Sequence, residues 1–326
     1  MSEFIKFFNE LSKASVKIAG GKGASLGEMT RAGIPVPSGF VVTAAAFDRF
    51  LQEMNLKAEI EAWIHKVNYK DVNSVDRSSN TIRDLIHDAR MPEDLQTDIL
   101  EAYKKLHNSP SPSYLKRGGL GMLVAVRSSA TAEDSSQASW AGELESYLNS
   151  TEKILLGRVK DCWSSLFTPR AIVYRDEKGM RKTSVSVAVV VQKMVQSEIA
   201  GVCFTVHPVT KHRHQMIIEA CWGLGEALVG GEITPDSYVI DKRDWSLMDV
   251  AVSEQGKMRT RKNGGGVQLV AVGKLKSRQK LNGKQIVELA KLCGKIEKHY
   301  KFPCDIEWAL EKGKFYIVQS RPITTL

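Results

Sequence analysis

The stretch CDIEWALEKGKFYIVQSRP, from Cys304 to Pro322, decides the fold. Two apolar runs flank a short turn that contains a glycine, a pattern typical of a β-hairpin. Each run nevertheless carries polar residues, Asp305 and Glu307 in the first and Gln319 and Arg321 in the second. Side chains two positions apart on a strand share a face, so each pair points to one side. Folding about the turn sets Glu307 opposite Gln319, within about one residue of register.

Two carboxylates and an amide oxygen on one face predict a site for a hard cation. Magnesium prefers oxygen ligands, keeps several waters and shares the phosphate oxygens of a substrate. Arg321 adds a positive charge for a phosphoryl group. The alternative is an exposed face with an ordinary salt bridge, although the other residues of the hairpin are strongly apolar.

A second stretch, VAVRSSATAEDSSQASWAGELESYLN, runs from Val124 to Asn149. Its first residues predict a buried strand that ends at Arg127, followed by small residues that include Gly142 and Ser146. A forked guanidinium beside a small-residue loop suits polyphosphate, because backbone amides can approach the ligand. The alternative is an arginine that caps a helix or pairs with the acidic residues that follow at 133 and 134.

A third stretch, AGGKGASLGEM at residues 19–29, resembles a phosphate loop but lacks the Walker A pattern, since Gly23 rather than Ser or Thr follows Lys22. What remains is a lysine on a predicted turn, Gly20–Gly23, at the start of a helix. Backbone amides and the helix dipole favour an anion there, although an ordinary tight turn explains the glycines equally well. A further glycine cluster follows the strand at 216–222, and Leu228 breaks its dinucleotide-binding fingerprint.

The chain as a whole predicts an α+β protein with two lobes, or one domain with a mobile part. It has 326 residues, longer than one core usually grows, with 43% apolar and 25% charged residues. Strands are expected at 185–195 and 201–206 and a helix at 285–299, while residues 52–108 read as a helical insertion with one break near Asn73. No apolar run reaches membrane-spanning length. Five cysteines without close spacing favour reduced thiols and a cytoplasmic location.

The net charge of +9 is concentrated in one segment, because nine Lys or Arg and no Asp or Glu lie between Lys257 and Lys284. The simplest interpretation is a solvated, mobile basic loop. The other is a surface that meets polyphosphate or an acidic partner. No aromatic residue interrupts the segment, so a stacking platform for single-stranded nucleic acid is not expected.

Together these stretches resemble the N-terminal ATP-binding domain of pyruvate phosphate dikinase, phosphoenolpyruvate synthase and rifampin phosphotransferase. The matching runs occur in family order over nearly the whole chain and include GGKGASLGEM, VAVRSSATAED, IEACWGLGEALVGGEITPDSY and the closing hairpin. The resemblance implies an ATP-grasp fold, in which two α+β lobes hold ATP between them. The lobes would be 1–185, with the helical insertion, and 186–326, with the metal-binding hairpin.

The resemblance also implies roles for individual residues. Lys22 and Arg127 would bind the phosphates of ATP, and Arg321 would steady the transferring phosphoryl group. Glu307 and Gln319 would bind ATP and its Mg²⁺, with Asp305 as a further acid beside the metal. The remaining nucleotide contacts would come from the triphosphate loop and the adenine-binding strand, namely Gly142, Ser146 and Gln192.

The family cleaves ATP and passes a phosphoryl or pyrophosphoryl group to a histidine on a separate swivelling domain. The Ser-His motif of that swivelling domain is absent from this sequence. His207, in FTVHP, is predicted to have a structural role. We therefore expect either a subunit of a split enzyme or a fragment of a longer one. A self-contained ATP-grasp ligase that forms an acyl phosphate is an alternative, as is a non-catalytic nucleotide-binding module.

Overall fold

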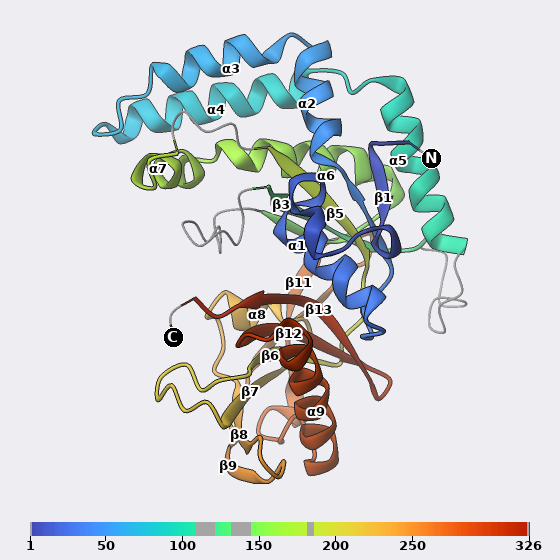
Figure 1. Ribbon diagram of the computed structural model, residues 1–326, viewed down its shortest axis with the longest axis vertical. Coiled ribbons are helices and arrows are strands. Elements are labelled where there is room, and N and C mark those ends of the chain that lie inside the picture. The colour runs from blue at the N-terminus through green and yellow to red at the C-terminus, as the bar shows by residue number, and fades with distance from the viewer. Residues whose placement is uncertain (1, 109–120, 132–144, 181–185, 325) are drawn as a thin grey trace. The chain divides into compact units, whose positions relative to one another are not determined.

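The structure, a computed structural model, describes residues 2–108, 121–131, 145–180, 186–324 and 326 (Figure 1). Its contacts divide the chain into two compact units. The first comprises Met1–Glu28 and Ser38–Met194, and the second comprises Met29–Pro37 and Val195–Leu326. The predicted lobe boundary at residue 185 stays a prediction, because grouping by contacts does not test which segments fold together.

The first unit is built on a five-stranded antiparallel sheet with the order β1-β2-β5-β3-β4. The two central strands, β3 and β5, are almost entirely buried, as their apolar runs predict. Aromatic side chains fill the core on one side, where the rings of Phe50 and Trp163 stack with centroids 5.0 Å apart. The strands are β1 (Ile5–Phe7), β2 (Gly39–Val42), β3 (Val124–Ala130), β4 (Ser146–Ser150) and β5 (Val187–Lys193).

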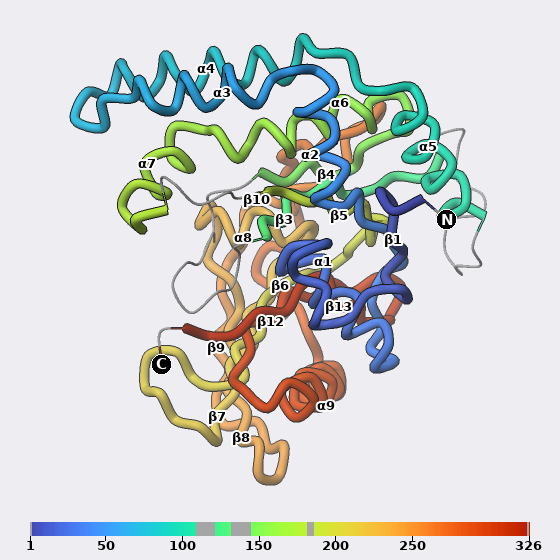
Figure 2. Tube along the Cα trace, turned by 45° about the horizontal axis from the view of Figure 1, so that its top comes forward, coloured from blue at the N-terminus to red at the C-terminus, as the bar shows by residue number. Residues whose placement is uncertain are grey.

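Helices surround this sheet, and the predicted helical insertion forms three of them. The insertion has two breaks rather than the one that was expected. The first lies at residues 66–71, before Asn73, because the Asp71 carboxylate accepts a hydrogen bond from the Asn73 amide at 3.0 Å and starts a new helix, and the second lies at residues 89–92. Helices α3 and α4 run side by side (Figure 2). The helices are α1 (Val16–Arg31), α2 (Ala44–Glu53), α3 (Leu56–His65), α4 (Val72–Asp88), α5 (Glu93–Asn108), α6 (Glu152–Ser164) and α7 (Pro169–Glu177).

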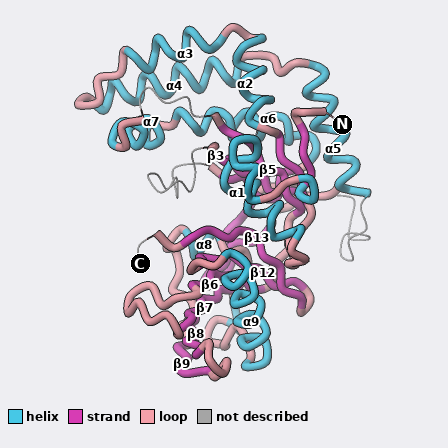
Figure 3. Tube along the Cα trace, in the orientation of Figure 1, coloured by secondary structure: helices cyan, strands magenta, loops and turns pink. Residues whose placement is uncertain are grey.

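The second unit is built on a six-stranded antiparallel sheet with the order β13-β12-β6-β7-β8-β9. Helix α9 (Gly283–Tyr300) packs on one face of this sheet (Figure 3). The strands are β6 (Ile199–Phe204), β7 (Gln215–Trp222), β8 (Asp236–Asp241), β9 (Leu247–Ala251), β12 (Cys304–Glu311) and β13 (Lys314–Pro322), and a short helix α8 (Glu226–Val229) follows β7.

The basic segment that was expected to be a loop forms a β-hairpin instead. Strands β10 (Lys257–Arg261) and β11 (Val267–Ala271) pair as a separate two-stranded sheet. The glycines at 264–266 all have positive φ, a conformation that glycine adopts easily. They form the turn that joins the two strands. Among the described residues, no helix is long and apolar enough to cross a membrane.

Candidate functional site

The closing hairpin has the predicted register. Glu307 lies opposite Gln319, and Asp305 lies opposite Arg321. The Nε and Nη2 atoms of Arg321 both lie 2.8 Å from Oδ2 of Asp305. Because directly opposed residues of an antiparallel pair share a face, the hairpin presents both carboxylates, the amide and the guanidinium on one side.

The other side of the hairpin is the apolar one. Ile306 is fully buried and lies opposite Cys203 of β6, and helix α9 packs against β12. Helix α9 therefore covers the face opposite to Glu307. The polar residues of the hairpin do not interrupt the core, since the core lies behind them.

A third acid, which sequence reasoning missed, lies on the same face. Glu307 is opposite Val202 of β6, and Val202 is opposite Glu219 of β7. One cross-strand row therefore contains Gln319, Glu307 and Glu219. The only signal in the sequence was a glutamate within the apolar run MIIEACW, and its significance depends on the strand order.

The acids of this face influence one another electrostatically. Burial raises the pKa of Asp305, the charge of Glu307 raises it further, and Arg321 opposes both. Burial also raises the pKa of Glu219, with an added contribution from Asp305. A face that holds partly desolvated carboxylates close together favours a bound cation, because a cation relieves their mutual repulsion.

The donor set fits magnesium better than a metal held by the protein alone. Among the described residues, no group of three or more His, Cys, Asp or Glu side chains is arranged to hold a metal ion. Glu307, Gln319 and Asp305 could supply a few hard oxygen ligands from one face. Magnesium commonly binds in this way, with few protein ligands and with the rest from water and substrate phosphates.

In the first unit, the five-stranded sheet brings three other predicted residues to one face. Arg127 of β3 lies opposite Ser146 of β4. Gln192 of β5 lies opposite Ala125, two positions before Arg127. Arg127, Ser146 and Gln192 therefore share a face, although Gln192 is buried and Ser146 is exposed.

The glycine segment with Lys22 is attached to the same face through Ser129, two residues beyond Arg127. The Ser129 hydroxyl donates to the Ala19 carbonyl at 2.8 Å and accepts from the Gly23 amide at 3.3 Å. Gly20 has φ +67°, and a Cβ there would lie 2.2 Å from Ser129 Oγ, so only glycine fits. The predicted four-residue turn is therefore wrong in extent, because only Gly20 leaves the helical conformation and Lys22 lies in the helical turn that follows.

The predicted residues thus fall into two groups, one in each unit. Lys22, Arg127, Ser146 and Gln192 belong to the first unit, and the four hairpin residues belong to the second. Gly142 lies outside the described residues. The Nδ1 atom of His207 accepts from two backbone amides of its own turn at 3.3 Å, which agrees with the predicted structural role.

Comparison with known proteins gives the chain a family. Residues 16–326 match the family model described as "Pyruvate phosphate dikinase, AMP/ATP-binding domain". The chain is 46% identical over 326 residues to a probable phosphoenolpyruvate synthase of Methanocaldococcus jannaschii, with 99% of this chain and 27% of that protein covered. It is 44% identical to the corresponding protein of Methanothermobacter thermautotrophicus, with coverage of 100% and 47%.

A phosphoenolpyruvate synthase of Pyrococcus furiosus is 41% identical, with coverage of 99% of this chain and 44% of that protein. The chain thus spans between about a quarter and a half of the length of these relatives. Its mixed α+β architecture with two large sheets is that expected of an ATP-grasp-type domain. With nearly its entire length matched, the chain belongs to the pyruvate phosphate dikinase AMP/ATP-binding domain family.

Proposed function

We propose that the chain is the ATP-binding catalytic component of a phosphoenolpyruvate-synthase-like phosphotransferase. It cleaves ATP with Mg²⁺ and passes a phosphoryl or pyrophosphoryl group to a histidine on a separate domain or subunit. The observation that supports this most strongly is the grouping of polar residues: Arg127, Ser146 and Gln192 share one face of the first sheet, while three acids, the Gln319 amide and Arg321 share one face of the second. A magnesium–triphosphate requires both sets of groups.

The first-unit residues bind the triphosphate in this proposal. The Arg127 guanidinium donates in a fork to phosphate oxygens, and Lys22 adds a second positive charge. The Ser146 hydroxyl opposite Arg127 donates a further hydrogen bond, and the family resemblance adds Gly142 as a further contact of the triphosphate. Gln192 contacts the adenine with its amide. Backbone amides of the helical turn after Gly20 favour the anion as well.

The second-unit residues hold the metal and the transferring group. Glu307 and Gln319 ligate Mg²⁺, with Asp305 as a further acid, and Arg321 neutralises charge on the phosphoryl group. Mg²⁺ supplies charge neutralisation and orientation of the phosphate oxygens when it is bound. Catalysis then consists of positioning and electrostatic stabilisation, which these side chains can provide without a nucleophile of their own.

The phosphoryl acceptor is supplied in trans or by a further part of a longer protein. The relatives are two to four times the length of this chain, which leaves room for a histidine-bearing domain. To test this, the chain is incubated with Mg·ATP labelled at the β or γ phosphate. One reaction also contains the part of the Pyrococcus furiosus relative that lies outside the matched region.

We expect AMP and an acid-labile β label on the added protein, with the γ label either beside it on the histidine or released by water as phosphate, and all of these only when both components are present. Formation of ADP that depends on an amine and a carboxylic acid would instead identify a self-contained ligase. Binding of ATP without turnover in any combination would identify a non-catalytic module.

Arg127→Ala tests the first-unit residues within this proposal. We expect loss of transfer by about 100- to 1000-fold, because the forked phosphate contact is removed, with unchanged thermal stability. Arg170→Ala is the matched control, since Arg170 is an exposed arginine on α7 of the same unit. Normal transfer by Arg127→Ala would remove this residue from the site.

A further inference from the structure

The β10–β11 hairpin has one occupied edge and one open edge. On the β10 side, the Leu224 amide donates to the Arg259 carbonyl at 2.9 Å. The loop after β7 approaches closely there, because Gly223 has φ +84° and a Cβ would lie 2.5 Å from the same carbonyl. This explains the glycine after the β7 strand, which the nucleotide site does not use.

The hydrogen-bond pattern shows which groups the other edge exposes. Lys262 donates to Gly266, and Val272 donates to Gly256, each at 3.1 Å, just outside the two ends of the hairpin's strands. Hydrogen-bonded and non-hydrogen-bonded pairs alternate along an antiparallel ladder. Counting inward from both ends places Val267, Leu269 and Ala271 in non-hydrogen-bonded pairs, so their N–H and C=O groups point away from β10.

No hydrogen bond from the described part of the chain reaches these outward groups of β11. The strand itself is half-buried to exposed, and the Leu269 side chain is 50% exposed. A two-stranded sheet is marginally stable alone, and an open edge of this kind is a template for a further strand.

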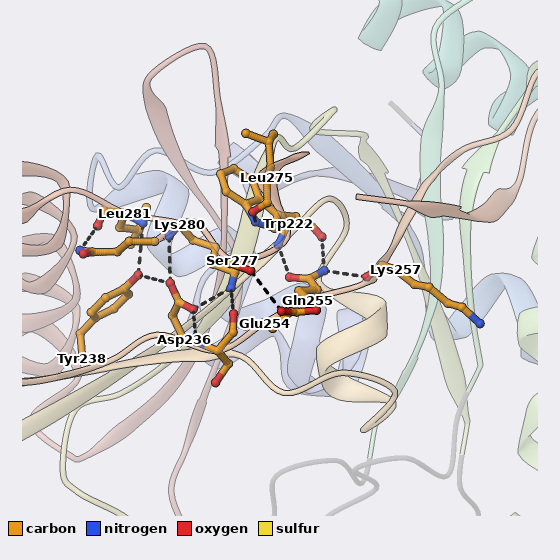
Figure 4. Close-up of polar contacts among 12 residues, drawn as sticks. Trp222, Asp236, Tyr238, Glu254, Gln255, Lys257, Leu275, Ser277, Lys280 and Leu281 are labelled. Atoms are coloured by element: carbon orange, nitrogen blue, oxygen red, sulfur yellow. Dashed lines mark hydrogen bonds and ion pairs between the residues drawn. The ribbon is translucent and has the colours of Figure 1, made fainter. Parts of the chain in front are cut away.

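The hairpin is nevertheless held firmly at its base (Figure 4). The buried Gln255 side chain accepts from the Trp222 amide at 2.8 Å and donates to the carbonyls of Trp222 and Lys257. Trp222 Nε1 donates to the Leu275 carbonyl at 3.2 Å. The Arg259 guanidinium bonds Glu232 and Glu226 beside the β7 loop. The open edge is therefore presented on a fixed support rather than on a loose loop.

The segment that contains the open edge is positively charged. Of the nine Lys and Arg between Lys257 and Lys284, three form ion pairs within the chain, namely Arg259, Lys276 and Lys280. The other six form no ion pair with the residues that the structure describes: Lys257, Arg261, Lys262, Lys274, Arg278 and Lys284. No acid lies in the segment to compensate them.

We propose that the open edge of β11 binds an acidic, extended segment of a partner protein as a third strand. Backbone hydrogen bonds to Val267, Leu269 and Ala271 would supply the pairing. The cations of the hairpin itself that form no ion pair with the described residues, Lys257, Arg261 and Lys262, would select acidic side chains. A second copy of this chain is a poor occupant, since two equally basic edges would repel. Exposed Leu269 and the absence of aromatic residues favour polypeptide over nucleic acid.

The proposal is tested with the full chain and a fluorescent seven-residue peptide of alternating glutamate and valine. We expect saturable binding by fluorescence anisotropy that weakens with salt. A peptide with lysine in place of glutamate should not bind. The glutamate–valine peptide N-methylated at alternate amides keeps its charge but cannot pair, and it should bind at least roughly tenfold more weakly.

Leu269→Pro tests the edge from the protein side. Proline removes an N–H that points away from β10, so the hairpin should keep its own ladder. We expect roughly tenfold weaker peptide binding. If Leu269→Pro lost the hairpin by circular dichroism, the N-methylated peptide would still make the same test. Lys262→Glu should also weaken binding, whereas Lys291→Glu, the same charge change at an exposed site on α9, should not.

Hydrogen exchange gives a readout specific to the edge. The peptide should slow exchange at Val267, Leu269 and Ala271 while leaving the rest of the hairpin unchanged. Equal binding of the methylated peptide, or unaltered exchange at these amides, would overturn the proposal. So would stronger binding of a single-stranded oligonucleotide of equal charge, or self-association of the chain that Leu269→Pro abolishes.

Discussion

Two aspartate–cation pairs of the second unit differ in burial and in the completeness of their hydrogen bonding. Asp236 of β8 and Lys280 are both fully buried, and their Oδ1 and Nζ atoms lie 2.7 Å apart (Figure 4). Both oxygens of the Asp236 carboxylate accept hydrogen bonds from protein groups. Oδ1 also accepts from the Ser253 amide at 2.9 Å, and Oδ2 accepts from the Tyr238 hydroxyl and the Lys280 amide, each at 2.8 Å.

Asp305 and Arg321 form the second pair, on the polar face of the hairpin. Both contacts from the guanidinium end on Oδ2 of Asp305, and no other hydrogen bond reaches this carboxylate from the described residues. The Arg321 side chain is 31% exposed and that of Asp305 is 12% exposed. Burial and Glu307 raise the pKa of Asp305 despite its partner.

The difference separates a charge pair that protein groups complete from one that they leave partly open. A buried pair is tolerated when each lone pair and proton has a partner, and Asp236–Lys280 meets that condition while joining the base of the β10–β11 hairpin to β8. Asp305 is only partly compensated by protein groups and lies beside two other acids. That arrangement is costly for stability, and it suits a site whose remaining partners are a metal and a nucleotide.

Removing one member of the buried pair should have the largest effect on stability. Lys280→Met leaves Asp236 as a buried charge without its counter-ion. We expect the free energy of unfolding to fall by about 3–5 kcal/mol, measured by urea denaturation.

Lys276→Met is the matched control, because Lys276 pairs with Glu254 on the surface, with more than half of each side chain exposed. Its effect should be about 0.5 kcal/mol or less. Equal destabilisation by the two variants would mean that the buried network does not hold this unit together.

Substitutions on the acidic face of the closing hairpin should behave in the opposite way. They should greatly reduce activity and have little effect on folding. Glu307→Ala removes a proposed ligand of Mg²⁺. We expect transfer from Mg·ATP to fall by about 100- to 1000-fold, with an unchanged urea midpoint. Glu288→Ala, at an exposed glutamate on α9, should retain full activity. A variant of Glu307 that transfers normally would remove this face from the proposed site.

The hairpin was predictable because its information is local. Alternation of polar and apolar residues around one turn specifies which side chains share a face, and the observed pairs Asp305–Arg321 and Glu307–Gln319 agree with it. A continuous apolar run at 123–126 predicted the buried β3 strand that carries Arg127, but the strand does not end at Arg127 as expected and continues to Ala130. The α+β class followed from the mixture of strand and helix patterns, and the family match confirms the ATP-grasp assignment.

What escaped prediction depends on contacts between distant segments. Glu219 joins the acidic face only because β6 lies between β12 and β7, and strand order does not follow from periodicity. Ser129 became significant only through its bonds to the glycine segment, more than 100 residues earlier. The basic hairpin was missed because the three glycines at 264–266 indicated a loop, whereas they form the turn between two strands.

Asp305→Asn should sharpen the comparison between the two pairs. Asparagine keeps the shape and one acceptor but removes the charge. We expect the rate of transfer from ATP at limiting Mg²⁺ to fall roughly 10- to 100-fold. A loss of this size is common when an acid beside a metal ligand is removed. The free energy of unfolding should change by about 0.5 kcal/mol or less, because burial and Glu307 disfavour the Asp305 charge and offset its contact with Arg321. Strong destabilisation would place Asp305 in the structural class with Asp236.

Glu219→Gln should have the smallest effect, visible as a change in the pH dependence of stability. Burial raises the pKa of Glu219 above its ordinary value of 4.5, so the folded protein holds this proton more tightly than the unfolded chain. The contribution of Glu219 to stability is therefore fully present below pH 4.5 and is lost as the pH rises through the folded-state pKa.

Glutamine cannot titrate, so the variant should gain stability relative to the wild-type protein as the pH rises above 4.5. Urea denaturation at a series of pH values measures this difference, and Glu288→Gln controls for the loss of a surface charge. A difference that stays flat with pH, or that grows as the pH falls, would show that Glu219 is not desolvated on this face. The acidic face would then consist of the hairpin residues alone, and the cross-strand row through β6 would carry no electrostatic coupling to Asp305.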